Sequence, residues 1–482
     1  MNRRRFLKYA GATAAVVGAS TLGLDYLLRP KLNSQQTSTS TIISLAPPTI
    51  TNFKWQPTKI VNGKVYDATI SFDVESAEPA TSLSGILKPY APTIPARAYP
   101  AEDPITLRFT TSPQSSDVTT YSANVANLKG GKQYALNAQA VNAAGTQTAN
   151  FETPYVREFE KALNSELTIG AYYYPWYTPS KFASNPEPAK GTPLLGYYDS
   201  QDQMIQSKHI DWSTGHGISF WLSSWFGPKD DRAAAIFQNP LSSDIKMGIL
   251  YESLGLLSVT QSTQDDIYGA NWLIDLDDKN NSDLVVGHVN FLAENYFGNP
   301  QYLRIDEKPV LFLYVSSVYA GNIEHVFGLM RDAAQNQGYG LFLFGDEMFW
   351  QSEASLGRLK LYDAVTAYLM PTHGPTGVTI DNYSSRLDGA FDTWSRKAAA
   401  AGTGFVPVVS PGFHSVKETR AIVRDPQEFG ERFETAKKHL DGRLKMLMVT
   451  SFNEWYEDTY VEPSLGDGFK YLQIIRHTLS GT

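Results

Sequence analysis

The chain contains no cysteine among its 482 residues. This absence excludes disulfide bonds, thiolate metal ligands and a lipid anchor on an N-terminal cysteine. A cysteine-free sequence is compatible with an exported protein, although it does not by itself indicate export.

A basic surface is missing as well, because 49 acidic residues outnumber 41 basic ones and give a formal net charge of −8. Nucleic acid and anionic membrane surfaces are therefore not expected as main partners. The sequence has no His-Glu-x-x-His motif or carboxylate cage, and its 8 histidines are dispersed. We therefore expect neither a metal ion nor another cofactor.

Apolar runs that approach the length of a membrane span are absent beyond the N-terminus. There, Arg3-Arg4-Arg5-Phe6-Leu7-Lys8 matches the twin-arginine export pattern, and a small-residue apolar stretch follows it. We predict a twin-arginine signal over 1–29, a Ser/Thr-rich linker over 30–48 and an extracellular or cell-surface location. No clean Ala-x-Ala cleavage site is visible, so removal of the segment and its retention as a membrane anchor both stay open.

Aromatic residues, in contrast, are plentiful, with 27 Tyr and 9 Trp in the chain. These numbers exceed what a core needs and indicate a stacking surface for a flat-faced ligand such as a sugar. The length predicts two domains.

Residues 49–157 are predicted to form a small all-β sandwich, because short strands alternate with turn residues. The clearest alternation runs from Val65 to Val74. The stretch from Leu128 through the glycine turn to Tyr134, with the tract that ends at Gly145, resembles the end of a fibronectin type III domain. Such modules space or orient a catalytic domain, and a glycan-binding role stays open.

Residues 158–482 show a different pattern, in which short apolar strands alternate with helical stretches such as Asp283–Asn295, Ile323–Gln337 and Asp425–Leu440. Eight strands in one domain of this size predict a (β/α)8 TIM barrel, so the fold class is α/β with a small immunoglobulin-like sandwich before it. The predicted strands are Thr168–Tyr174, Ile218–Ser223, Lys246–Tyr251, Val310–Val315, Leu341–Phe344, Ala364–Leu369, Phe405–Val409 and Lys445–Thr450.

Two carboxylates, Glu454 and Glu457, follow the last of these strands directly. Functional residues of such barrels lie just after the strand ends. Hydrolysis of a glycosidic bond needs one group that protonates the leaving oxygen and another that carries or creates the nucleophile. Aromatic and acidic residues also recur after the other strands, and such a mouth suits a neutral, hydroxyl-rich substrate. Each of these residues alone is more often structural.

The barrel sequence, from about Leu167 to Leu479, resembles glycoside hydrolase family 99 and the related domains found beside glycosyltransferases. The matching motifs are Tyr-Tyr-x-Pro-Trp-Tyr at the first strand, Trp-Phe-Gly after the second, Leu-Tyr-Glu at the third, Pro-Gly-Phe at the seventh and Ser-Phe-Asn-Glu-Trp-Tyr-Glu-x-Thr-x-x-Glu-Pro at the eighth. The last motif is the most distinctive.

The resemblance implies a metal-independent, retaining endo-α-mannosidase that cuts within glycans. Glu454 would deprotonate the sugar 2-hydroxyl, which attacks its own anomeric carbon to give a 1,2-anhydro intermediate. Glu457 would protonate the departing oxygen and later activate water. The remaining candidates are assigned to substrate binding: Tyr174, Trp176, Trp225, Glu252, Tyr368, His414, Asn453, Tyr456 and Glu462. For Glu462, a role in orienting its loop and a purely structural role stay open.

Two positions depart from the family pattern, since Tyr456 stands where members commonly have His and Asp458 where they have Gly. Asp458 is expected either to raise the pKa of Glu457 by like-charge repulsion or to point to solvent. The departures bear on the mannose specificity more than on the reaction class.

We expect a monomer that acts on an oligosaccharide or polysaccharide. Two alternatives stay open. One is a non-catalytic carbohydrate-binding or cell-surface protein that keeps the barrel as a scaffold. The other is a different retaining or inverting glycosidase, which the separation of the two carboxyl groups would distinguish.

Overall fold

The computed structural model describes residues 46–90, 103–162, 166–184, 189–261, 272–347, 355–369, 382–414 and 421–480. The predicted signal over 1–29 and most of the linker predicted over 30–48 lie outside these residues. Within the described ranges, no helix combines the length and the apolar character needed to cross a membrane.

The first strands of the chain form two four-stranded antiparallel sheets, in the orders β1-β2-β6-β5 and β4-β3-β7-β8. In β2 every second side chain is buried, as the alternation predicts, and the two sheets share one hydrophobic cluster. The strands are β1 (Thr49–Val61), β2 (Lys64–Glu75), β3 (Ser82–Tyr90), β4 (Ile105–Thr106), β5 (Thr110–Pro113), β6 (Val118–Val125), β7 (Gln133–Asn142) and β8 (Gly145–Glu152).

Tyr134 closes the turn before β7 in the way a tyrosine corner does. Its ring is buried, and its hydroxyl donates to the carbonyl of Lys129 at 3.0 Å. Leu128, just before this turn, is buried in the same cluster. Membership of the fibronectin type III family stays a prediction.

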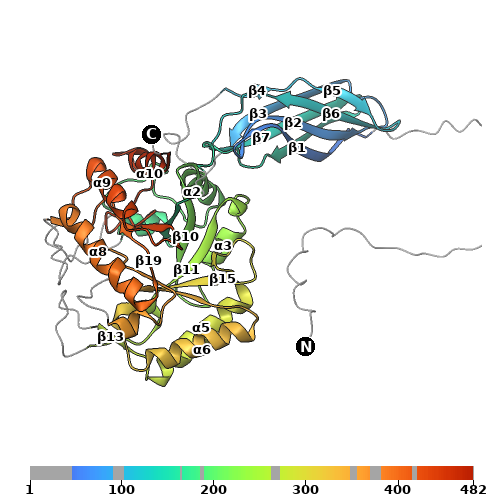
Figure 1. Cartoon of the computed structure of the whole chain (residues 1–482). Coiled ribbons are helices and arrows are strands. Elements are labelled where there is room, and N and C mark those ends of the chain that lie inside the picture. Colours follow the sequence, from blue (N-terminus) through green and yellow to red (C-terminus); the bar gives the residue numbers. More distant parts are fainter. Residues whose placement is uncertain are drawn as a thin grey trace, which may run out of the picture. The chain divides into compact units, whose positions relative to one another are not determined.

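The main sheet of the remaining chain is curled and parallel, in the order β19-β18-β17-β15-β11-β10-β9-β21-β20. Helices α5, α6, α8 and α9 lie on the outside of its strands (Figure 1). The strands are β9 (Thr168–Tyr173), β10 (Ile218–Trp225), β11 (Lys246–Tyr251), β15 (Lys308–Leu313), β17 (Phe342–Asp346), β18 (Ala364–Thr366), β19 (Gly404–Phe405), β20 (Val408–Val409) and β21 (Met446–Val449).

The two ends of this sheet, β19 and β20, are halves of one extended segment. The N–H of Val406 donates to the carbonyl of Val365 on one side, and the carbonyl of Pro407 accepts the N–H of Met448 on the other. Pro407 has no N–H to donate, which breaks the segment into two short strands. The sheet therefore closes on itself with eight strand positions, as a TIM-like barrel does.

Each predicted barrel strand overlaps an observed one. The prediction Ala364–Leu369 is too long at its end, because β18 stops at Thr366 and the N–H of Tyr368 donates to the Asp346 side chain instead of continuing the ladder. Strand interiors such as Ile249 and Leu311 are fully buried, as expected of strands covered on both faces.

Several helices, α9 among them, begin at residues whose side chains cap them. Asp425 accepts the N–H of Glu428 at 2.9 Å, and Pro426 occupies the first turn of α9. The helices are α1 (Pro179–Ser184), α2 (Gln203–Gly215), α3 (Arg232–Phe237), α4 (Ser253–Leu256), α5 (Lys279–Asn295), α6 (Ile323–Asn336), α7 (Leu356–Leu359), α8 (Tyr383–Ala401), α9 (Pro426–Lys437) and α10 (Lys470–Ser480), with short 3-10 turns η2 (Ser242–Asp244) and η3 (Ser316–Val318). Short accessory strands are β12 (Thr260–Gln261), β13 (Trp272–Asp275), β14 (Arg304–Ile305) and β16 (Tyr319–Ala320).

Candidate active site

The segment that follows β21 folds back over the end of the barrel. The N–H of Phe452 donates to the carbonyl of Tyr172 on β9 at 2.8 Å, and the N–H of Glu462 donates to the carbonyl of Phe452 at 2.8 Å. This fold-back places the predicted catalytic pair over the carboxyl ends of the first and last barrel strands.

Glu454 is the more deeply buried of the two carboxyl groups, with 5% of its surface exposed. Its Oε1 accepts the hydroxyl of Tyr177 at 2.8 Å and the N–H of Tyr456 at 3.0 Å. Burial, followed by the charge of Glu457, raises the pKa of Glu454 well above its ordinary value, and the two donors oppose this rise. Glu454 thus holds its proton more strongly than an exposed glutamate does.

Glu457 is partly exposed and has a different set of partners. Its Oε2 accepts the hydroxyl of Tyr368 at 2.9 Å, and its backbone carbonyl accepts the N–H of His414 at 2.8 Å. His414, a predicted substrate contact, therefore reaches the motif through its backbone. The two glutamates share one neighbourhood but differ in burial and in donors, which is the asymmetry that an acid and a base need.

A third carboxyl group, Glu252, follows β11 and is 7% exposed. Its Oε1 accepts the hydroxyl of Ser224 at 2.6 Å. Burial, aided by the charge of Glu457, raises the pKa of Glu252 to about 8, while the Ser224 bond acts in the opposite direction. Glu252 is therefore mostly neutral near pH 7 and can donate a hydrogen bond.

Tyr174 and Tyr314 lie among these three carboxyl groups. Burial comes first and the nearby glutamate charges second in raising the pKa of both phenols well above 10.0. The ring of Tyr314 meets that of Tyr368 edge-on, with centroids 5.4 Å apart. Tyr314 was not among the sequence candidates, although its place directly after β15 is the signal that marked the others.

Asn453 contacts the backbone of Tyr174. Its Oδ1 accepts the Tyr174 N–H at 2.8 Å, and its Nδ2 donates to the Tyr174 carbonyl at 3.0 Å. The side chain is fully buried. Both polar atoms of its amide thus hold the Tyr174 backbone in place, and a contact of Asn453 with substrate stays a prediction.

Glu462 is buried behind the site. Its Oε1 lies 3.1 Å from Nε2 of His209, and its Oε2 accepts the hydroxyl of Tyr198 at 2.7 Å and the indole N–H of Trp455 at 2.9 Å. Nδ1 of His209 in turn lies 3.1 Å from the hydroxyl of Tyr173. These contacts favour the loop-orienting role over substrate contact.

Trp225 does not lie at the mouth of the barrel. Its ring is fully buried and packs against His288 and Phe291 of α5, with centroids 5.5 and 6.0 Å away. The exposed aromatic ring at this strand end is that of Phe226, which is 39% exposed. Phe226 lies beside the half-buried ring of Trp176, at 5.7 Å between centroids.

The two departures from the family pattern have separate partners. The ring of Tyr456 lies tilted against that of Tyr177, with centroids 5.3 Å apart, and its hydroxyl donates to the carbonyl of Lys181 at 2.8 Å. Asp458 lies 3.5 Å from Nε of Arg424. Burial raises the pKa of Asp458 to about 6 against the effect of Arg424. Asp458 thus faces an arginine instead of pointing into solvent, and its expected effect on the pKa of Glu457 stays a prediction.

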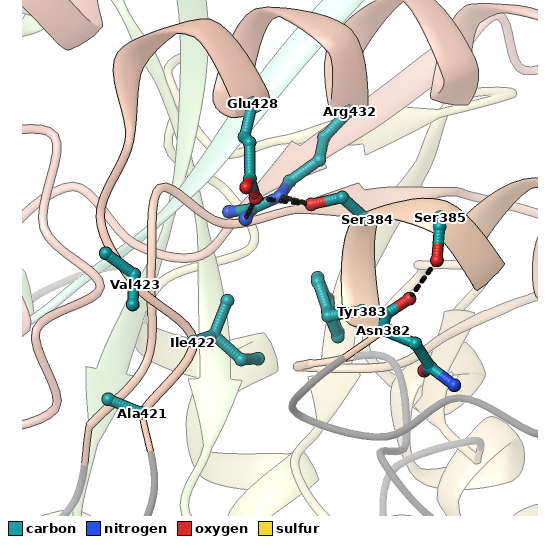
Figure 2. Close-up of a pocket in the computed structure, with 9 residues that line it drawn as sticks. All are labelled: Asn382, Tyr383, Ser384, Ser385, Ala421, Ile422, Val423, Glu428 and Arg432. Atoms are coloured by element: carbon teal, nitrogen blue, oxygen red, sulfur yellow. Dashed lines mark hydrogen bonds and ion pairs between the residues drawn. The ribbon is translucent and has the colours of Figure 1, made fainter.

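A separate cavity of about 330 Å³ lies between the starts of α8 and α9. Figure 2 shows Arg432 at its wall, bonded to Glu428 and Ser384. Arg432 also donates to the carbonyl of Ser410 at 2.8 Å. Its charge is therefore already satisfied by the protein. Among the described residues, no group of His, Asp and Glu gathers that could hold a metal ion.

No protein-family model matches the chain, and no curated protein matches it. Among solved structures, the endo-α-mannosidase of glycoside hydrolase family 99 from Bacteroides thetaiotaomicron is similar over 65% of this chain and 96% of its own, at 18% identity and a TM-score of 0.48. A β-glucuronidase from Bifidobacterium dentium is similar over 91% and 67%, at 9% identity and a TM-score of 0.38.

A family 123 glycoside hydrolase from Clostridium perfringens is similar over 86% of this chain and 81% of its own, at 10% identity and a TM-score of 0.35. At these identities and scores, the reaction of the present chain has to be inferred from its own residues.

Proposed function

We propose that the protein is a retaining endo-glycosidase that cleaves α-mannosidic or closely related linkages in glycans. The observation that carries the proposal is that Glu454 and Glu457, three residues apart after the last barrel strand, each accept the hydroxyl of a different tyrosine, while the charge of Glu457 acts on Glu454. The motif resemblance to family 99 supplies the sugar and the linkage.

In the proposed reaction, Glu454 takes the proton of the sugar 2-hydroxyl while that oxygen bonds to the anomeric carbon. The glycosidic bond breaks, and the departing oxygen takes the proton of Glu457. Water then attacks the anomeric carbon and gives its proton to Glu457, while the bond from that carbon to the 2-oxygen breaks and the 2-oxygen recovers a proton from Glu454. Two displacements at one carbon retain its configuration.

The protonation states required by this scheme follow from the interaction between the two groups. Glu454 must be ionised while Glu457 is protonated. The charge of Glu457 is one of the two main causes that raise the pKa of Glu454, and it vanishes when Glu457 carries its proton. Burial and the smaller effect of the Glu252 charge then oppose the donors Tyr177 and Tyr456, which favour the ionised form.

The walls of the site suit a neutral sugar. Tyr174, Trp176, Tyr314 and Phe226 present ring faces and edges, which stack on the apolar faces of pyranose rings. A neutral Glu252 adds a donor for a sugar hydroxyl. The one cation described against these walls, Arg232, lies over the ring of Phe226 at 5.9 Å and is paired with Asp230 at 2.6 Å.

The proposal is tested by incubating the protein with a panel of α-mannans and mannosyl oligosaccharides and following the first product by NMR. The expected result is an initial α-anomer released from within an α-linked chain. An initial β-anomer would exclude retention. Tight binding without cleavage of any member would identify the carbohydrate-binding alternative instead.

We also propose that the protein acts outside the cytoplasm, on the basis of the pattern around Arg3 and Arg4. Replacement of both residues by Lys should leave the protein in the cytoplasmic fraction of its host, while the parent is recovered from the cell surface or medium. Recovery of the parent and the variant in the same fraction would overturn the proposal of export. The size of the exported protein tells whether the segment is removed or retained.

A further inference from the structure

Asp346, at the end of β17, joins the two strands that flank β17 in the barrel. Its carboxylate is fully buried, with 0% exposed. One oxygen, Oδ2, accepts the N–H of Val315 after β15 at 3.0 Å, and the other, Oδ1, accepts the N–H of Tyr368 after β18 at 2.8 Å. Burying a carboxylate costs free energy unless it accepts hydrogen bonds. The two backbone N–H groups offset that cost for Asp346.

The Val315 contact holds an unusual turn. Val315 has φ 52° and ψ 36°, a left-handed conformation that a β-branched residue adopts only when its surroundings impose it. The residue before it, Tyr314, donates its own N–H to the carbonyl of Tyr251 at 3.2 Å. Tyr314 is thus held on both sides at the point where the chain turns away from the barrel.

The Tyr368 contact leads to the proposed acid. Tyr368 is bonded through its N–H to Asp346, its carbonyl accepts the hydroxyl of Thr450, and its own hydroxyl donates to Oε2 of Glu457 at 2.9 Å. The ring of Tyr368 meets edge-on that of Tyr314, the residue before Val315, so the two residues that Asp346 bonds belong to segments that pack against each other.

We propose that Asp346 is a positioning residue that sets the Tyr368 hydroxyl against Glu457 and so controls how readily Glu457 gives up its proton. The inference rests on the proposed function for its meaning in catalysis, but its physical content can be tested without substrate. Groups that face Glu457 from the surrounding strand ends are Glu252, Tyr174, Tyr314, Tyr368 and Glu454.

The test is a double-mutant cycle read by carbon NMR. The carboxyl signal of Glu457 is assigned by its loss in Glu457→Gln, and its titration midpoint is measured in the parent, Tyr368→Phe, Asp346→Asn and the double variant. Loss of the phenol donor should move the midpoint upward by about one pH unit. Because Asp346→Asn also removes a charge, only the difference between the two backgrounds is informative, and that difference cancels the direct charge effect.

We expect Tyr368→Phe to shift the midpoint in the parent background and to shift it by less than half as much in the Asp346→Asn background. Equal shifts in both backgrounds would overturn the proposal. Glu347→Gln is the matched control, since Glu347 is the next residue and equally buried but bonds to Arg358 and Tyr362. In its background the full shift should persist.

Near-UV circular dichroism checks that each variant is folded. Should Asp346→Asn not fold, Asp346→Glu, which keeps the charge and displaces the carboxylate by one methylene, takes its place in the cycle. Loss of the fold by both would make Asp346 a structural residue and overturn the positioning role. A parent that cleaves no glycan would defeat the proposed function while leaving this cycle decisive for Asp346.

Discussion

The hydroxyl of Tyr177 donates to Oε1 of Glu454 at 2.8 Å, across 277 residues of sequence. Tyr177 follows β9, the first strand of the barrel, and Glu454 follows β21, the last. The same phenol oxygen accepts the N–H of Trp455 at 2.9 Å. One tyrosine therefore fixes both the proposed base and the residue beside it.

Tyr177→Phe should move the acidic limb of the pH profile of kcat/KM upward. The Tyr177 bond lowers the pKa of Glu454, so its loss raises that pKa further, and the ionised base then appears only at higher pH. A shift of about one pH unit is expected, with a loss of about 1 kcal/mol in stability from the unpaired Trp455 N–H.

The control is Tyr198→Phe, which removes a buried phenol bonded to Glu462 and not to Glu454. Its acidic limb should match that of the parent. An unchanged limb in Tyr177→Phe would mean that Glu454 is not the base.

Glu454→Gln and Glu457→Gln should each lower kcat by about 10²–10⁴-fold, the usual contribution of a general acid or base. The two variants should be blocked at different steps of the reaction. With an aryl α-mannooligosaccharide whose phenolate leaves without protonation, Glu457→Gln should still release a burst of phenolate, and Glu454→Gln should not.

Stopped-flow absorbance measures the burst, and Glu431→Gln on the exposed face of α9 is the control for substitution as such. Equal bursts from both variants would show that the two roles are assigned wrongly.

Glu252→Gln should alter how stability depends on pH. The folded-state pKa of about 8 exceeds the ordinary value of 4.5, so the stabilisation is complete below pH 4.5 and is lost as pH rises through about 8. Between these values the parent loses up to about 1.4 kcal/mol per pH unit from this group.

The variant cannot ionise, so its stability relative to the parent should grow from pH 5 to pH 8. Urea denaturation at several pH values measures the difference. A difference that does not change with pH would show that Glu252 ionises normally in the folded protein.

Glu462→Gln should destabilise the protein by about 1–3 kcal/mol, because the amide cannot accept from His209, Tyr198 and Trp455 together. Glu434→Gln is the comparison, since it breaks only an exposed pair with Lys437 and should cost less than about 0.5 kcal/mol. Chemical denaturation provides both values, and equal costs would contradict the role given to the buried network.

Local patterns in the sequence located the barrel strands but did not predict the direction of every side chain. Eight apolar segments located the barrel strands, and Pro407 explains the one segment that is broken. Trp225 was misplaced because successive strand residues point to opposite faces. Ser224 reaches Glu252 inside the barrel, so its neighbour Trp225 turns outward to α5.

The partners of the two glutamates could not be read from the chain. Tyr177 and Tyr368 lie 277 and 89 residues away from the carboxyl groups that they contact. Asp346 likewise acts on backbone N–H groups, which carry no mark in the sequence. Such contacts arise only when the barrel closes, so the motif located the carboxyl groups while their tuning required the fold.

A series of side-chain hydrogen bonds links Tyr173, His209, Glu462 and Trp455. It passes from the first barrel strand through α2 to the segment after the last strand. It crosses the seam between β9 and β21, where the two ends of the barrel sequence meet. A ligand held by Tyr174 and Glu454 together would bridge that same seam. Binding would then oppose opening of the barrel, so occupancy of the site would be measurable as a rise in melting temperature, even with a compound that is never cleaved.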